Sequence, residues 1–284
     1  RMLGMKKIVG IAVLFLCGGY FVLARASIEP ASIGMDELLA QMERRAERIQ
    51  SGRFGYVQEI VLLGQLLQRE GKGALVSGGK LNMSTQMSSP VGEIFSRLTA
   101  DGKTIWQEVR MGEDIQVIKY DLAELDVEME ANLSGLGIWG VLEPAKFDKL
   151  REKILQNYEM RILGMDKSGS SPVYLVDVQI KSDPSSGWAA GERMEVALGV
   201  EDTFVRSISV FDGEGNVLSK LVLDEPEFNG DVADSLFSYT PPTGVEVEDG
   251  NAMLKRMGGE TQRRDGLLYS EGPNFKLEDL DGNW

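Results

Sequence analysis

Alternation of apolar and polar residues, interrupted by short turn sequences, is the feature that most constrains how this 284-residue chain folds. Within residues 193–249, Ile208 and Val210 alternate with serines, which is the period of a half-buried strand. The sequence DGEGN at 212–216 then turns the chain, because Gly and Asn tolerate the positive φ of tight turns. Residues 217–223 return as a second strand, so this stretch predicts an antiparallel hairpin.

The same alternation recurs along the chain and predicts a mainly β protein. Further strands are expected at 78–87, 115–120, 158–165 and 173–180, and residues 94–109 are expected to form a hairpin around an Asp-Gly turn at 101–102. Apolar residues at helical spacing predict helices at 34–49 and 147–157. Residues 54–67 fit a strand or a helix, and the acidic residues 121–130 fit a linker or a solvated helix. We expect an α+β fold in which a strongly curved antiparallel sheet wraps over one or two helices.

Two motifs resemble the LolA/LolB-like family of periplasmic lipoprotein carriers. The family's tail pattern "LF.Y.PP.GV.V.D" matches Leu236, Phe237, Tyr239, Pro241, Pro242, Gly244, Val245, Val247 and Asp249. Its "DGkt.W" turn matches Asp101, Gly102, Lys103, Thr104 and Trp106. The resemblance implies a half-barrel whose sheet and helices enclose an apolar cavity for acyl chains.

The N-terminal 26 residues have the organisation of a signal peptide. Lys6 and Lys7 precede an apolar run at 8–23, and Ala24-Arg25-Ala26 fits the small-x-small rule for cleavage before Ser27. The run is short for a membrane span. We expect a periplasmic or otherwise exported protein, with an uncleaved membrane anchor as the alternative.

The C-terminal end has a different composition. The half-barrel domain is expected at 27–249, and residues 250–271 are expected to form a linker or a short tethering helix. Residues 272–284 resemble the "aPdF.L.dLdG" entry of a redoxin domain of the peroxiredoxin or TlpA type. None of the residues here matches the reactive cysteines of those families, so redox activity would need a downstream domain.

Composition excludes several classes of function. The net charge of −14 argues against nucleic acid as a partner. The absence of histidine excludes Ser-His-Asp and Cys-His catalysis and disfavours a zinc site. Carboxylate pairs such as Asp121 with Glu124, or Glu246 with Glu248, depend on a spatial separation that sequence does not give, and most such groups are solvated charges. We therefore expect a non-enzyme with no catalytic residues, cofactor or metal.

Two short motifs have an ordinary explanation that outweighs the functional one. Residues 135–140 fit GxGxxG, but an acidic segment precedes them and Pro144 follows, so an apolar loop or lid is favoured over a dinucleotide site. Residues 212–216 resemble the start of a calcium loop, but the sixth position is Val217 and not glycine.

The expected function is reversible binding of a lipid, a lipoprotein acyl chain or another apolar ligand. Candidate wall residues, each of which could equally be ordinary core, are Leu81, Met83, Trp106, Val117, Trp139, Val176, Ile208 and Val210. Membrane contact is expected through ligand delivery or an uncleaved N-terminal segment. The alternatives are an envelope sensor that binds a partner protein, and a structural spacer for a downstream redox domain.

Overall fold

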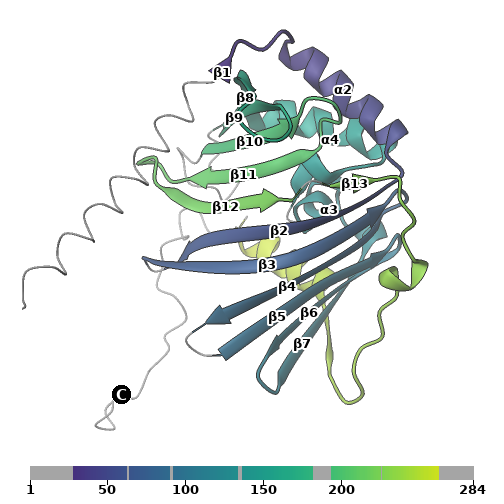
Figure 1. Ribbon diagram of the computed structural model, residues 1–284. Coiled ribbons are helices and arrows are strands. Elements are labelled where there is room, and N and C mark those ends of the chain that lie inside the picture. The colour runs from purple at the N-terminus through teal and green to yellow at the C-terminus, as the bar shows by residue number, and fades with distance from the viewer. Residues whose placement is uncertain are drawn as a thin grey trace, which may run out of the picture.

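The computed structural model describes residues 28–62, 64–89, 92–133, 136–181, 193–224 and 226–261. Within these residues the strands form one 14-stranded sheet (Figure 1). Its strands are β1 (Ile28–Glu29), β2 (Ser51–Leu62), β3 (Gln65–Val76), β4 (Lys80–Ser89), β5 (Gly92–Asp101), β6 (Thr104–Met111), β7 (Asp114–Asp121), β8 (Tyr158–Asp166), β9 (Val173–Ile180), β10 (Arg193–Gly199), β11 (Val205–Phe211), β12 (Val217–Leu223), β13 (Glu227–Phe228) and β14 (Val247–Asp249).

The sheet is antiparallel except at one edge, where β14 pairs in parallel with β7. Its order is β1-β8-β9-β10-β11-β12-β2-β3-β4-β5-β6-β7-β14, with β13 paired to β2 off this path. The junction between β12 and β2 joins two sets of sequential hairpins into one curved surface (Figure 1). The expected fold class is confirmed. Within the uncertain stretch 54–67, residues 54–62 and 65–67 are strand, because β2 and β3 pair with each other.

The helices lie on one face of the sheet, which we call the inner face; the opposite face is the outer face. They are α2 (Met35–Arg48), α3 (Val127–Leu133), α4 (Pro144–Asn157) and α5 (Gly250–Thr261), with short 3-10 turns η2 (Leu122–Glu124), η3 (Gly137–Gly140) and η4 (Asp234–Phe237). The two helices predicted from periodicity, α2 and α4, are confirmed. The segment left open as linker or solvated helix is η2 followed by α3, and Leu122, Leu125 and Leu133 pack against the sheet.

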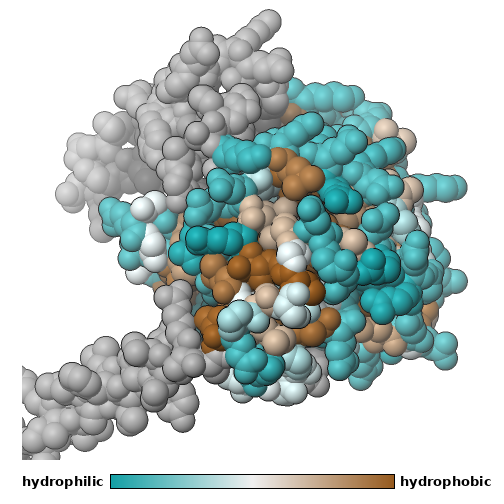
Figure 2. Space-filling view, turned by 90° about the horizontal axis from the view of Figure 1, so that it is seen from above, coloured by the Kyte–Doolittle hydropathy of each residue, from teal (hydrophilic) through white to brown (hydrophobic). Residues whose placement is uncertain are grey.

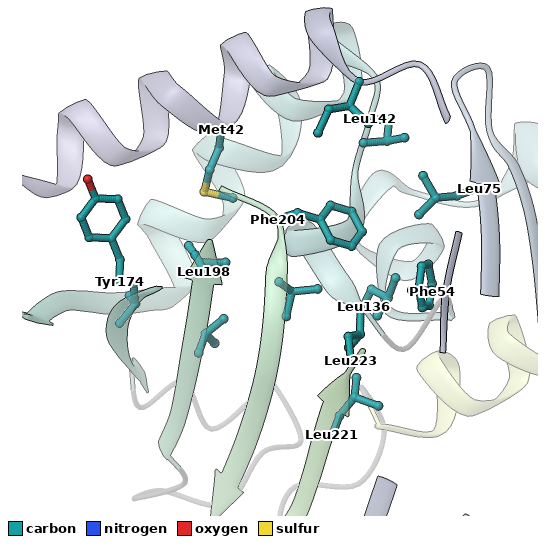
Figure 3. Close-up of a cluster of buried hydrophobic side chains, with 14 of the residues drawn as sticks. Met42, Phe54, Leu75, Leu136, Leu142, Tyr174, Leu198, Phe204, Leu221 and Leu223 are labelled. Carbon is teal, nitrogen blue, oxygen red and sulfur yellow. The ribbon is translucent and has the colours of Figure 1, made fainter. Parts of the chain in front are cut away.

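The main core fills the space between α2, α4 and the inner face. Figure 3 shows Met42 pointing from α2 toward side chains of the sheet, Leu198 among them. Phe204 packs edge-on against Phe228, with ring centroids 5.2 Å apart. A second cluster, formed by Ala100, Ile105, Ile118 and Tyr120, lies under α3 and α5.

Helix α5 extends the packed part of the chain past Asp249. Its residues Met253 and Leu254 pack against the second cluster, and the Asn251 side chain bonds both backbone groups of Asp121. The segment expected as a linker or tethering helix therefore begins as a helix docked on the sheet. The predicted signal peptide at 1–26 and redoxin entry at 272–284 lie outside the described residues.

Seen from above, apolar surface gathers near the middle and polar side chains surround it (Figure 2). Among the described residues, no helix has the length and apolar character needed to cross a membrane.

Two glycines of β3 make room for aromatic rings of β2. A Cβ on Gly73 would overlap the Phe54 ring, and one on Gly71 would overlap the Tyr56 ring. Both rings belong to the main core. The spacing of the two glycines therefore fixes where the rings of the paired strand lie.

Gly73→Ala is expected to lower the free energy of unfolding by about 1–3 kcal/mol, because the Phe54 ring must leave its position in a packed core. Chemical denaturation measures this loss. Gly230→Ala is the control, since a Cβ there meets nothing within 4 Å. Equal stability of the two variants would contradict the prediction.

Candidate apolar binding site

Five of the eight predicted wall residues lie on the inner face. Val176 and Ile208 flank Val196 in register across β9, β10 and β11. Val176 is buried in the main core and Ile208 packs against it, while Val210 lies two residues further along the same face of β11. Leu81 and Met83 lie on β4 in the other half of the sheet. The five share a face but do not form one pocket.

Trp106 and Val117 lie on the outer face. Strand alternation places Trp106 opposite its neighbour Ile105, which belongs to the inner cluster. The Trp106 ring lies 5.4 Å from the ring of Tyr239, and Lys119 Nζ lies 5.5 Å from the Trp106 ring. Val117 pairs with Glu108, which binds Tyr239 on the same face. Trp139 belongs to η3, and its side chain lies outside the described residues.

An apolar pocket of about 90 Å³ lies between the inner face and the segment from α3 to α4. Its floor is one cross-strand row, formed by Leu75, Leu81, Ala100 and Ile105 on four successive strands. Its cover includes Val127, Leu136, Val141 and Leu142. Of the predicted wall residues whose side chains are described, Leu81 lines this pocket.

The residues of the pocket floor sit beside turns, and sequence analysis identified Leu81 but missed Leu75, Ala100 and Ile105. Leu75 and Leu81 flank the turn at 77–79, and Ala100 and Ile105 flank the Asp-Gly turn at 101–102. Antiparallel pairing puts such positions directly opposite each other, so turn positions combined with strand period could have identified the row. The cover could not be identified that way, because Leu136 and Val141 lie in irregular segments.

Lys146 of α4 lies at the pocket and bridges two carboxylates. Its ammonium is 2.6 Å from Glu130 of α3 and 3.2 Å from Glu143. Burial opposes the charged form of Lys146, but hydrogen bonds and charge from Glu130 and Glu143 outweigh it and raise the pKa. The ammonium is therefore charged at neutral pH and ties α3 to α4 beside an apolar space.

Arg45 of α2 is fully buried and joins α2 to two other segments. Its guanidinium donates to the carbonyl oxygen of Thr203 at 2.8 Å and to that of Val141 at 2.7 Å. It also lies 5.6 Å from the centroid of the Phe204 ring. Burial lowers the pKa of Arg45 to about 10, which still leaves the group charged at neutral pH. Arg45 thus connects α2 directly to Val141 of the pocket cover.

On the outer face, Glu108 holds the segment that follows η4. Its side chain is 1% exposed and accepts hydrogen bonds from the Tyr239 hydroxyl and from Arg110 Nε. Burial opposes ionisation, but these hydrogen bonds and the charges of Arg110 and Arg97 lower the pKa of Glu108. Burial and the adjacent carboxylate raise the pKa of Tyr239 above its usual range. The contact is structural and lies on the face away from the pocket.

The remaining motifs have structural roles. A helix, α3, and not a strand, comes before the glycines at 137 and 140, so the dinucleotide arrangement is absent from this segment. Asp212 accepts hydrogen bonds from the backbone N–H groups of Glu214 and Asn216, which uses the carboxylate to close the hairpin turn. Within the described ranges, no group of three or more His, Cys, Asp or Glu side chains is arranged to hold a metal ion.

No family model matches this chain, and no curated protein matches it. Solved structures with a similar fold include MucB (14% identity, 72% of this chain, TM-score 0.40). An uncharacterized conserved protein from Thermus thermophilus has 13% identity over 75% of this chain and 98% of its own (TM-score 0.45). A LolA superfamily protein from Nitrosomonas europaea has 9% identity over 73% of this chain and 99% of its own (TM-score 0.31).

This chain spans 62% of the length of the MucB chain that it matches. At these identities and TM-scores, the similarity carries no information about ligand or partner.

Proposed function

We propose that this chain is an exported, non-catalytic protein that buries an apolar ligand, such as a lipid or a lipoprotein acyl chain, between the inner face and the segment from α3 to α4. The observation that carries the proposal is the pocket floored by Leu75, Leu81, Ala100 and Ile105. An acyl chain gains about 0.8 kcal/mol per buried CH₂, so such a site needs no catalytic group.

The size of the pocket sets a condition on this function. Its 90 Å³ is smaller than the cavities of about 150 Å³ that hold benzene. It is also below the roughly 300–1,000 Å³ of typical small-molecule sites. A ligand must therefore displace part of the cover that contains Leu136. Met42, Met83, Met160, Met165 and Met194 contribute to the adjoining core, and methionine adapts to such rearrangement.

A structural spacer for a redoxin domain is the second candidate. The filled core beneath α2 favours it, because Leu38, Leu39 and Met42 are buried against the sheet. In this second candidate function, the half-barrel domain spans residues 27–249 and the redoxin domain begins at residues 272–284. A spacer would bind no lipid, so one measurement separates the two functions.

That measurement is native mass spectrometry of the full chain purified from a bacterial periplasm, with lipid analysis of its organic extract. We expect phospholipid or lipopeptide near one molecule per chain. An empty chain that also fails to take up added fatty acid would overturn the apolar-ligand proposal and leave the spacer.

Ala100→Leu tests the location of the site. The added carbons extend into the pocket, so fatty-acid affinity is expected to fall by about tenfold or more, while the free energy of unfolding changes by less than about 1.5 kcal/mol. Ala46→Leu is the contrast: Ala46 is as buried as Ala100 but does not line the pocket. There the added carbons overpack the core, at a cost of about 1–3 kcal/mol. Unchanged affinity in Ala100→Leu would place the ligand elsewhere.

A further inference from the structure

A groove crosses the outer face of the sheet from the end of β12 to β5. Its volume is about 800 Å³, which lies within the roughly 300–1,000 Å³ of typical small-molecule sites. Leu236 of η4 lines one part of it, and Asp224 and Glu227 line another. This space, which we call the outer groove, is much larger than the apolar pocket on the inner face.

The floor of the outer groove is one cross-strand row. Four of its members lie in register on successive strands from β2 to β5, and they are Gly55, Lys72, Ser84 and Arg97. The row continues to Asp224, whose backbone N–H donates to the carbonyl oxygen of Gly55 at 2.9 Å. Phe54 and Tyr56, the neighbours of Gly55, belong to the main core, so strand alternation places the row on the outer face.

One end of the row is negatively charged. A Cβ on Gly55 would overlap Asp224 Oδ2, so the absence of a side chain at position 55 lets the carboxylate lie over the backbone of β2. Glu227 lines the same end of the groove. Among the described residues, neither carboxylate forms an ion pair. Both are therefore available to a cationic group.

The other end carries two cations on either side of a hydroxyl. Lys72 and Arg97 flank Ser84 on the neighbouring strands. Within the described part of the chain, neither cation forms an ion pair and the Ser84 hydroxyl has no hydrogen-bond partner. Arg97 lies 5.4 Å from the centroid of the Phe95 ring, and its charge helps to lower the pKa of Glu108. Two cations that flank a hydroxyl can bind an anionic group through charge-assisted hydrogen bonds.

We propose that the outer groove binds a short peptide-like zwitterion, with its anionic end between Lys72 and Arg97 and its ammonium end at Asp224. The Asp224 carboxylate lies over β2 and Ser84 lies on β4, so the two ends are about 10 Å apart, or two strand spacings. An extended chain spans about 3.5 Å per residue, so a peptide of roughly two or three residues places its terminal charges at the two ends. The groove and the apolar pocket lie on opposite faces, which makes this inference independent of the proposed function.

Titration of the full chain with glycine peptides, followed by ligand-observed NMR, tests the site. These peptides have no apolar side chain and so do not probe the apolar pocket. Triglycine is expected to bind at least about threefold more tightly than single glycine, whose charges are too close together to reach both ends. It should also bind more tightly than N-acetyl-triglycine, which lacks the ammonium, and triglycine amide, which lacks the carboxylate.

Substitutions separate the two ends of the groove. Asp224→Asn is expected to lower the affinity for triglycine about three- to tenfold without weakening N-acetyl-triglycine, whereas Lys72→Gln should weaken both. Gly55→Ala changes no charge, but its Cβ displaces the Asp224 carboxylate, so it should also weaken triglycine. Asp148→Asn and Lys149→Gln make the same charge changes at exposed positions of α4 and should leave both affinities unchanged.

Three results would overturn the inference. The first is triglycine that does not bind, or binds no more tightly than its two blocked forms. The second is an equal loss of affinity in Asp224→Asn and Asp148→Asn. The third is an Asp224→Asn variant that weakens triglycine and N-acetyl-triglycine alike, because only triglycine carries the ammonium. Fatty-acid uptake by these variants should match that of the unaltered chain, so failure here is distinguishable from failure of the proposed function.

Discussion

Arg45→Met is expected to lower the free energy of unfolding by about 2–5 kcal/mol. The substitution leaves the carbonyl oxygens of Thr203 and Val141 without their donor, and each unsatisfied buried acceptor costs about 1–3 kcal/mol. Relief of the cost of burying a charged group offsets part of this loss. Urea denaturation followed by circular dichroism measures the difference.

Arg44→Met is the matched control, one residue away on the same helix. Arg44 is exposed and pairs with Glu37 at 2.7 Å on the surface, where ion pairs contribute little. Arg45→Lys separates charge from geometry, because a single ammonium cannot reproduce the planar fork that reaches two carbonyl groups. We expect Arg45→Lys to remain well below the unaltered protein in stability. A loss under about 1 kcal/mol in Arg45→Met would show that α2 is held by apolar packing alone.

Tyr239→Phe is expected to cost about 1.5–3 kcal/mol. The change removes one hydroxyl, which donates to the almost fully buried carboxylate of Glu108, and hydrogen bonds to charged groups are the strong ones. The ring contact with Trp106 is retained in the variant. Tyr120→Phe is the control, since the Tyr120 hydroxyl makes a long 3.3 Å hydrogen bond to the neutral side chain of Gln107. Equal losses in the two variants would show that the charge of Glu108 adds no stability beyond that of a hydrogen bond to a neutral group.

The same contact predicts a pH dependence. The folded pKa of Glu108 lies below the usual value of 4.5, so the stability from its ionised form is fully present above that value. It is lost as pH falls through the folded pKa, because the unfolded chain then binds the proton more readily. The stability difference between the unaltered protein and Glu108→Gln should therefore be constant near neutral pH and shrink below about pH 4.5. A difference that is flat down to about pH 3 would contradict this sign.

Periodicity predicted the individual elements well where one face of an element is buried. Helix α2 was predicted because Leu38, Leu39 and Met42 lie on one stripe, and that stripe is the buried one. The hairpins at 101–102 and 212–216 were predicted because turn chemistry is local. The strand character of residues 54–67 was left open because leucines at 62, 63, 66 and 67 fit both periods. Pairing between β2 and β3 decided it.

The wall residues were harder to predict because strand period gives two faces without saying which is inside. Trp106 is a large aromatic residue of the kind that fills cores, yet it lies on the outer face under Tyr239. Ala100 is small and was not among the predicted wall residues, yet it lines the pocket. A buried arginine such as Arg45 also gives no local signal, since its partners lie 96 and 158 residues away.

Local spacing and composition were enough to predict the α+β class, the hairpin turns, the two long helices and the exclusion of histidine-based catalysis, because these depend on neighbouring residues or on residue content. Which face of the sheet the helices cover, and which residues meet in the pocket, became clear only from the three-dimensional fold. Those outcomes depend on strand register and on contacts between distant segments. A one-residue change of register would exchange the two faces of a strand, and the order of residues along the chain does not record that choice.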